Sequence, residues 1–235
     1  MSWLDELRFG TTSGPPWVEL GTGRTDRWCT PLADRGAKEA LLRDHRAEVL
    51  AGPTPVLAAL ERAALLVEED LCLLRPDADG HFVLVAGCVC APAHWRLTDK
   101  LGKSIAAVHD PVAHYADDLA AKVDHFLSRL RPGVVVARRN WMVHETSTRF
   151  EPVCPPVLGV APPEQWLRSE RQTLHRLGDG TTVLFTIETT MAQLRDVPAG
   201  IRHALADRLA AEPADLLAYR NLTVRAPDLI AWLRG

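Results

Sequence analysis

The sequence of 235 residues lacks features that mark several large classes of protein. No apolar stretch approaches the roughly 20 residues that a membrane-spanning helix needs. Asp5, Glu6 and Arg8 interrupt the N-terminus where a secretory signal would have an apolar core. No Gly-rich loop matches a phosphate-binding or dinucleotide-binding fingerprint after a strand. We therefore expect a cytoplasmic protein that does not enter a membrane.

The chain also lacks an excess of positive charge. Its 27 Lys and Arg against 30 Asp and Glu give a formal net charge of -3, and the basic residues are spread along the sequence. Attraction to nucleic acid or to an anionic membrane depends on clustered basic charge. We expect neither of them as a partner.

The cysteines lack the spacing of a metal site. There are five of them, an odd number, and Cys88 and Cys90 form a C-x-C pair inside an apolar alternation. Such spacing places both side chains on one face of a strand, and no second pair follows nearby in the sequence to complete a zinc or iron–sulfur site. We expect reduced thiols with a structural role.

The sequence does contain enough apolar material for one large domain, because 47% of its residues are hydrophobic. Residues 1–33 are rich in Gly, Pro, Thr and Trp without sustained periodicity, which predicts an irregular lead-in. Asp34 is a candidate N-cap for a helix that continues to Ala51, and a second helix is expected to run to about Glu69. We therefore place a single domain at residues 34–235.

Strands are expected to follow as hairpins. Residues 71–74 and 81–90 flank a turn-rich loop, residues 134–144 form a further extended run, and residues 167–177 and 181–189 surround Gly178-Asp179-Gly180. Helical patterns lie between and after these strands. This order favours an α+β fold with an antiparallel sheet over a parallel, doubly wound sheet.

The last hairpin has a register that the sequence predicts. A turn at Asp179-Gly180 sets Arg171 opposite Glu188 and Thr173 opposite Thr186, all four on one face. Two interpretations are open: an exposed ion pair of little energetic value, or the polar wall of a pocket that holds a small substrate or oxygen.

His109 lies at the end of a short apolar helix that cannot continue. Leu101, Ile105 and Val108 fall on one helical face, and Pro111 disfavours helix at the residue before it. A histidine at this position either caps the helix or packs in the core, or it is an axial ligand to haem.

Several segments, taken in order, resemble the α-subunit family of haem-dependent oxidative N-demethylases. The resemblance covers about residues 34 to 222, and the ordered set is more specific than any single segment. The segments are residues 67–74, Trp95 with residues 100–112, residues 126–133, Arg139-Asn140-Trp141, Glu170-Arg171-Gln172-Thr173-Leu174 and Leu184-Phe185-Thr186-Ile187.

The resemblance implies a PAS-like domain in which a five-stranded antiparallel sheet and flanking helices form a pocket for haem b. It implies oxidative N-demethylation of a small secondary amine such as dimethylamine, with O2 and with electrons from partner proteins that carry flavin and iron–sulfur centres. Two non-enzymatic alternatives remain open, a haem-binding sensor of gas or redox state and a scaffold subunit without cofactor.

The resemblance also implies roles for particular residues around the haem. His109 matches the histidine of the family pattern and is the expected iron ligand. Asn140, Trp141 and Thr186 are expected around the macrocycle, although Trp141 could equally be a core aromatic.

Three further residues are expected to act on substrate or oxygen. Arg171 and Thr173 could stabilise negative charge that develops on oxygen. Glu188 stands where relatives usually carry an arginine. Its carboxylate could pair with Arg171 or attract a cationic amine.

Overall fold

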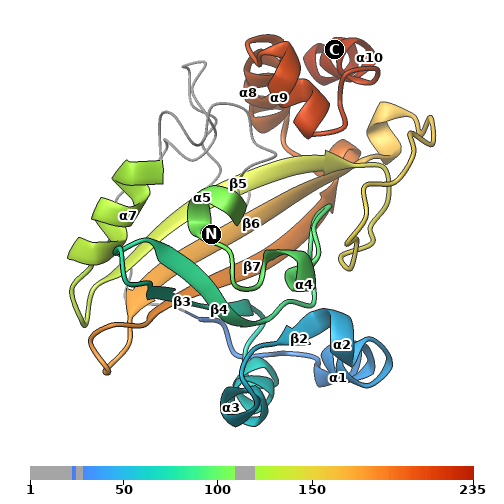
Figure 1. Ribbon diagram of the computed structural model, residues 1–235. Helices are drawn as coiled ribbons and strands as arrows, with labels where there is room; N and C mark the ends of the chain where they lie inside the picture. The colour runs from blue at the N-terminus through green and yellow to red at the C-terminus, as the bar shows by residue number, and fades with distance from the viewer. Residues whose placement is uncertain (1–22, 25–28, 109–119) are drawn as a thin grey trace.

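The computed structural model describes residues 23–24, 29–108 and 120–235. These residues form an α+β fold built on one seven-stranded antiparallel sheet with the strand order β1-β5-β6-β7-β3-β4-β2 (Figure 1). The strands are β1 (Gly23–Arg24), β2 (Leu50–Ala51), β3 (Asp70–Pro76), β4 (Phe82–Cys88), β5 (Val135–His144), β6 (Trp166–Arg176) and β7 (Val183–Gln193).

The sheet is larger than the five strands that the resemblance implies. Five strands are long, but β1 and β2 contribute two residues each at the two edges, where β1 pairs with β5 and β2 pairs with β4. The expected strand count is therefore wrong. A two-residue strand is too short to produce an alternating pattern, so the sequence carried no sign of either edge. The PAS-like classification stays a prediction.

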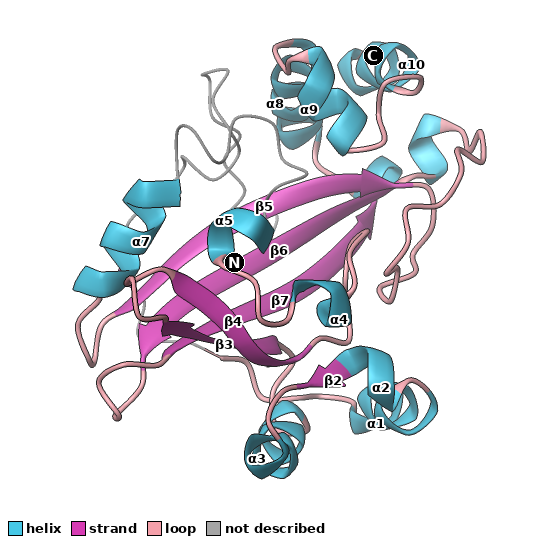
Figure 2. Ribbon diagram, viewed as in Figure 1, coloured by secondary structure: helices cyan, strands magenta, loops and turns pink. Residues whose placement is uncertain are grey.

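Helices lie at both ends of the sheet and against its surface, as Figure 2 shows. None of the helices in the described ranges is long and apolar enough to cross a membrane. The helices are α1 (Arg35–Asp44), α2 (Arg46–Val49), α3 (Thr54–Ala64), α4 (Leu97–Lys100), α5 (Ile105–Val108), α7 (Ala120–Arg129), α8 (Ala199–Ala210), α9 (Ala214–Tyr219) and α10 (Ala226–Arg234), with short 3-10 turns η2 (Pro162–Glu164) and η3 (Leu194–Asp196).

The first predicted helix begins where expected and ends early. The carboxylate of Asp34 accepts a hydrogen bond from the backbone N–H of Gly36 at 2.8 Å, which confirms Asp34 as the N-cap. The helix does not reach Ala51, because it breaks at His45 and the chain then pairs Leu50 with Cys88 of β4. Pairing at the sheet edge satisfies backbone groups that a longer helix would have satisfied internally.

The β6–β7 register agrees with the prediction. Arg171 lies opposite Glu188, and Thr173 lies opposite Thr186. At the tip, the carboxylate of Asp179 accepts hydrogen bonds from the backbone N–H groups of Thr181 (3.0 Å) and Thr182 (2.8 Å) and from the Thr182 hydroxyl. The Asp-Gly turn thereby sets the register of the two longest strands.

The predicted β3–β4 hairpin is also present, with an irregularity that redirects its side chains. The register shifts between Leu73, which pairs with Ala86, and Leu74, which pairs with Leu84. One residue of β4 is thus left over, as in a β-bulge. Leu84 therefore shares the face of Leu74, while Ala86 shares the opposite face with Leu73.

The two faces of the sheet are covered by different helices. On one face, Cys72, Leu74 and Leu84 pack with Leu127 of α7 and with Leu130, which directly follows this helix. On the other face, two separate apolar clusters form: one joins Trp141, Val143 and Leu167 to α8 and α10, and one joins Leu71, Ala86 and Cys88 to α1–α3. Figure 1 shows these two helical groups at opposite ends of the sheet.

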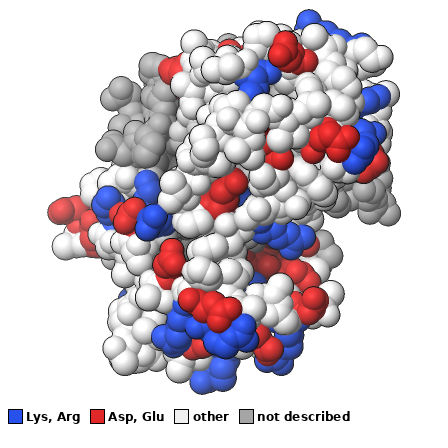
Figure 3. Space-filling model, turned by 90° about the vertical axis from the view of Figure 1, so that its right-hand side faces the viewer, with Lys and Arg blue, Asp and Glu red and all other residues white. Residues whose placement is uncertain are grey.

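The five cysteines are all free, in agreement with the expected reduced thiols. Cys88 and Cys90 are buried in the same apolar cluster, as their alternation predicts. On the face drawn in Figure 3, acidic and basic side chains lie beside one another in small groups, with wide uncharged areas between them.

We predict that the hairpin tip contributes stability that depends on pH. The hydrogen bonds from Thr182 lower the pKa of Asp179 to about 2. Since the folded-state pKa lies below that of the unfolded chain, this stability is present above about pH 4 and is lost as the pH falls toward 2. Asp179→Ala should lower the free energy of unfolding by about 1 kcal/mol at pH 7, with a smaller loss at pH 2. Urea unfolding at both pH values measures the difference.

Asp196→Ala is the matched control, because it removes one exposed carboxylate outside this hairpin. If Asp179→Ala lowers the free energy of unfolding equally at pH 7 and pH 2, the prediction is wrong.

Candidate functional site

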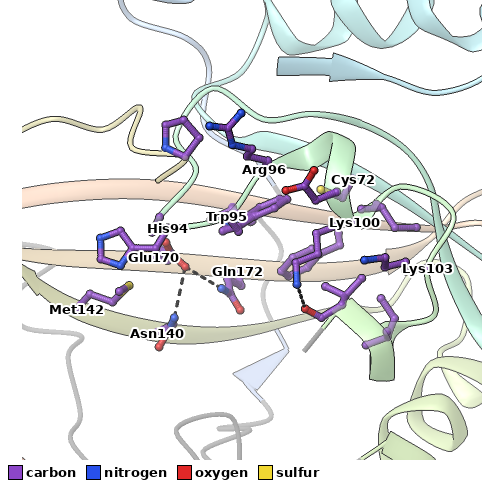
Figure 4. Close-up of a pocket in the computed structure, with 18 of the residues that line it drawn as sticks. Cys72, His94, Trp95, Arg96, Lys100, Lys103, Asn140, Met142, Glu170 and Gln172 are labelled. Atoms are coloured by element: carbon purple, nitrogen blue, oxygen red, sulfur yellow. Dashed lines mark hydrogen bonds between the residues drawn. The ribbon is translucent and has the colours of Figure 1, made fainter. Parts of the chain in front are cut away.

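A cavity of about 540 Å³ opens on the face of the sheet that carries Leu74 and Leu84. Its volume lies within the roughly 300–1,000 Å³ of small-molecule sites. The sheet forms one side, and the segment from Ala93 to Val108, which includes α4 and α5, forms the other (Figure 4). The loop at residues 152–154 and Tyr219 complete the lining.

Polar side chains from two neighbouring strands form part of this cavity, which we call the cavity floor: Arg138 and Asn140 of β5, and Glu170 and Gln172 of β6. The Gln172 amide donates a hydrogen bond to Oε2 of Glu170 at 3.0 Å, and the Asn140 amide donates to the same oxygen at 3.5 Å (Figure 4). Arg138 donates to Oε1 of Gln172 at 2.7 Å. The floor therefore presents a carboxylate whose orientation is held by amide donors.

The rest of the lining is largely apolar, with three cationic side chains and the carboxylate of Asp99 on one segment. Lys100 at the end of α4 donates a hydrogen bond to the backbone carbonyl of Val108, which ties α4 to the last residue of α5. Arg96 and Lys103 also line the cavity. The apolar lining comprises Leu74, Leu84, Trp95, Ile105, Val108, Met142, Val153, Phe185 and Ile187.

The structure divides the residues that the sequence singled out. Asn140 lines the cavity, and His109 lies outside the described residues, directly after Val108 in the sequence. Alternation along β5, β6 and β7 turns the remaining five to the other face of the sheet. These five are Trp141, Arg171, Thr173, Thr186 and Glu188.

Trp141 is a core residue of that other face. It is buried in the cluster with α8 and α10, and the guanidinium of Arg220 lies 4.2 Å from the centre of its ring. This packing is that of a core aromatic, and its contact with the macrocycle stays a prediction.

The other four residues form a polar strip between the two apolar clusters of that face. Thr173 and Thr186 are buried and share a hydrogen bond between their hydroxyls at 2.6 Å. Glu188 accepts a hydrogen bond from the Thr30 hydroxyl at 2.9 Å, and Arg171 is buried. The burial of Arg171 does not fit an exposed ion pair. It shows that this strip belongs to the interior and not to a solvated surface.

The buried carboxylate of Asp70 holds the segment that leads from β4 to the cavity. Asp70 accepts hydrogen bonds from the backbone N–H groups of Cys90 (2.7 Å) and Ala91 (3.0 Å), which holds the turn after β4. Burial raises the pKa of Asp70, and the charge of Lys38 opposes this shift. Lys38 itself donates to the backbone carbonyls of Val67 and Glu69 at 2.7 Å each.

Arg168 joins the sheet to two cavity loops from a fully buried position. Its guanidinium donates to Oε1 of Glu170 at 3.0 Å and to the hydroxyl of Thr189 at 3.1 Å. It also donates to the backbone carbonyls of Ala91 and Arg149. One side chain therefore connects the cavity floor to the loop after β4 and to the loop after β5.

Those two loops bring together His94, His144 and Glu151, a group that the sequence analysis missed. Nε2 of His94 lies 3.0 Å from Oε2 of Glu151, and Nδ1 of His144 lies 2.7 Å from the same oxygen. His94 lines the cavity, while His144 is buried at the end of β5. The three residues come from a loop, a strand end and a second loop, so no helical or strand spacing could have indicated them.

Burial favours the neutral form of both imidazoles in this group. Desolvation lowers the pKa of His144 to about 3, with a further contribution from the charge of Arg168. Desolvation also lowers the pKa of His94, against the charge of Glu151. Neutral imidazole is the form that can accept a proton or bind a metal ion.

We predict that Arg168→Met destabilises the protein strongly. The change leaves the carboxylate of Glu170 and two backbone carbonyls without their buried donor, and breaking such a pair costs about 3–5 kcal/mol. Thermal or urea unfolding should show this loss. Arg195→Met is the matched control, because the Arg195–Glu164 pair is 49% and 47% exposed and should contribute less than about 1 kcal/mol. Equal losses in the two variants would contradict the central role of Arg168.

Comparison with known families gives one match that covers most of the chain. The model described as "Haem-dependent oxidative N-demethylase, alpha subunit-like" matches residues 35–230. The match includes all of the strands from β2 to β7 and every described residue of the cavity. No curated protein matches the sequence.

Proposed function

Since this chain belongs to the haem-dependent oxidative N-demethylase α-subunit-like family, we propose that it is an oxidoreductase that binds haem b and uses O2 to oxidise a small amine. The reaction we propose is oxidative N-demethylation. In it, an N-methyl amine, O2, two electrons and two protons yield the demethylated amine, formaldehyde and water. A flavin or iron–sulfur partner protein would supply the electrons.

The observation that carries this proposal is the position of the cavity next to α5. Ile105 and Val108 of α5 line the cavity, and His109 is the next residue of the sequence. A haem needs an apolar slot for its ring and a nitrogen ligand for its iron. The residues of the cavity fit such a group.

The described lining offers partners for both parts of a haem. Leu74, Leu84, Phe185, Ile105 and Val108 supply apolar surface for the ring. The cationic side chains on the segment around α4 are suited to the carboxylates at the edge of the haem, because opposite charges attract most where water is partly excluded. These cations are Arg96, Lys100 and Lys103. When bound, the haem would supply the activation of O2.

The cavity floor is suited to hold the amine. A small secondary amine is protonated near neutral pH, and the Glu170 carboxylate is the acidic group of the floor. Arg168, Asn140 and Gln172 hold this carboxylate in place. Glu170 would therefore orient the ammonium group, and the apolar wall would exclude water from the site.

Arg171, Thr173, Thr186 and Glu188 stay predictions as catalytic or haem-contacting residues. The strands β6 and β7 lie between the described cavity and this polar strip. The Thr173–Thr186 hydrogen bond joins these two strands directly behind the cavity. We propose that the strip acts by positioning the floor, and that Glu170 binds the amine in place of Glu188.

We predict that the purified protein binds one haem per chain through His109. The oxidised and reduced proteins should show a Soret band, and carbon monoxide should shift the band of the reduced protein. His109→Ala should lose stoichiometric haem or change its spectrum, because it removes the iron ligand. His125→Ala is the control, since His125 is exposed on α7.

Absence of a Soret band after haem reconstitution would reject the enzyme and favour a scaffold without cofactor. Haem binding with a ligand-dependent spectrum, but without oxidation of any amine, would favour a sensor instead.

We predict that Glu170→Gln weakens amine binding without removing the haem. The loss of the carboxylate charge should raise the KM for a secondary amine at least about tenfold, which corresponds to about 1.4 kcal/mol. Formaldehyde release with a supplied electron donor measures turnover, and the Soret band measures haem content. Glu188→Gln is the matched control and should change KM less than about twofold. A larger rise in KM for Glu188→Gln than for Glu170→Gln would place the amine at the polar strip.

A further inference from the structure

His94, His144 and Glu151 form a cluster that the proposed oxidation of an amine does not use. Their candidate ligand atoms all lie within 4.8 Å of one another. The two imidazole rings are stacked, with centroids 5.1 Å apart and planes 29° from parallel. Side-chain exposures of 13%, 1% and 11% show that the whole group is largely buried.

The hydrogen bonding of this cluster is incomplete within the described part of the protein. Nδ1 of His144 lies 2.7 Å from the Glu151 carboxylate, but the direction of this contact does not meet hydrogen-bond geometry. Nε2 of His144 and Nδ1 of His94 are buried without a partner among the described residues. A buried polar atom without a partner destabilises the protein, so such atoms usually face an ion or a water molecule.

The backbone holds the three residues in place. The backbone N–H of His94 donates to the carbonyl of Glu151 at 2.7 Å, and the N–H of Glu151 donates to the carbonyl of Pro92 at 3.1 Å. His94 adopts a left-handed conformation with φ of +61°, which is uncommon for a residue with a side chain. Unusual backbone conformations persist where the surrounding structure enforces them, and they are common at functional sites.

We propose that His94, His144 and Glu151 bind a divalent first-row transition-metal ion, at a second site beside the cavity. Two imidazoles and one carboxylate are a ligand set that binds Zn²⁺ and Fe²⁺. Ligand atoms bonded at about 2.0–2.2 Å to one ion lie about 3 Å apart. The two N–O distances of 2.7 and 3.0 Å are close to this spacing, and all three ligand atoms lie within 4.8 Å of one another.

The site leaves coordination positions open toward the cavity. Three protein ligands with an open position are typical of reactive metal sites, whereas structural zinc sites have four. His94 lines the cavity, so a further ligand can reach the ion from there. The ion would therefore bind a water molecule or a small anion next to the cavity floor.

Two cations near the cluster limit the affinity for a metal ion. Arg168 and Arg225 both lower the pKa of His144 by their charge. Arg168 is bound to Glu170, while Arg225 donates to the side chain of Gln165 and to the carbonyl of Val143. The single negative charge of Glu151 only partly offsets them. We therefore expect weaker binding than at a closed structural zinc site.

The test measures Zn²⁺ in the full chain, which is first treated with a chelator, then incubated with Zn²⁺ and freed of excess metal. The wild-type protein should retain one Zn²⁺ per chain, and added Zn²⁺ should raise its melting temperature by mass action. Glu151→Gln and His144→Ala should bind Zn²⁺ at least about tenfold more weakly in competition with a coloured chelator. Absorbance counts haem separately, so this result does not depend on the proposed oxidation.

Two variants control for other ways of holding Zn²⁺. His175→Ala removes a half-buried histidine of β6 that is distant from the cluster. His144 pairs with Trp166, and His175 lies nine residues further along the same strand. Cys154→Ser removes the exposed thiol at the cavity. Both should retain one Zn²⁺ per chain. Loss of Zn²⁺ in Cys154→Ser would assign the metal to the thiol and overturn the proposal.

Equal Zn²⁺ content in wild type and Glu151→Gln would also overturn the proposal. If Glu151→Gln is less stable than wild type without Zn²⁺, and Zn²⁺ stabilises neither protein, the cluster only connects the two loops and binds no metal ion. Glu151→Gln keeps the size of the side chain, so this variant should remain folded.

Discussion

The buried guanidinium of Arg168 is the interaction on which the rest of the site depends. A charge in the interior is tolerated when it is paired and hydrogen-bonded, and each of the three guanidinium nitrogens of Arg168 donates, to Glu170, Thr189 or one of two backbone carbonyls. The same bonds hold the cavity floor, the loop that carries His94 and the loop that leads to Glu151. One side chain thus provides the ion pair with Glu170 and also holds the two loops in position around the site.

Alternation along the central strands separates the chemistry of the protein into two layers. Side chains at Asn140, Glu170 and Gln172 face the cavity, while those one residue later or earlier face the opposite side. A bulge in β4 lets one strand contribute Leu84 to the cavity and Ala86 to the other core. Family membership supports a haem-dependent function, and the proposed site for the haem is this cavity. The polar strip behind the cavity would then serve as support.

Local sequence signals predicted the parts of the fold that depend on neighbouring residues. The Asp-Gly turn fixed the pairing of Arg171 with Glu188, and the Asp34 cap marked the start of α1. The edge strands β1 and β2 were not predictable, because each has two residues and exists only through pairing with a distant strand. Asn140 was expected at the site, and it lines the cavity. The sequence could not show which face of the sheet carries the cavity, because this depends on which helices pack against each face.

The sequence by itself determined the α+β class, the register of the β6–β7 hairpin and the family, since turns, alternation and ordered motifs are properties of short segments. Only the tertiary structure decided which face of each strand meets the cavity. It also decided that His94, His144 and Glu151 meet, although 50 residues separate the two histidines and no periodic pattern joins the three. The physical reason is that loops acquire their positions from distant hydrogen bonds, here those of Arg168 and Asp70, and such bonds leave no local pattern in the sequence.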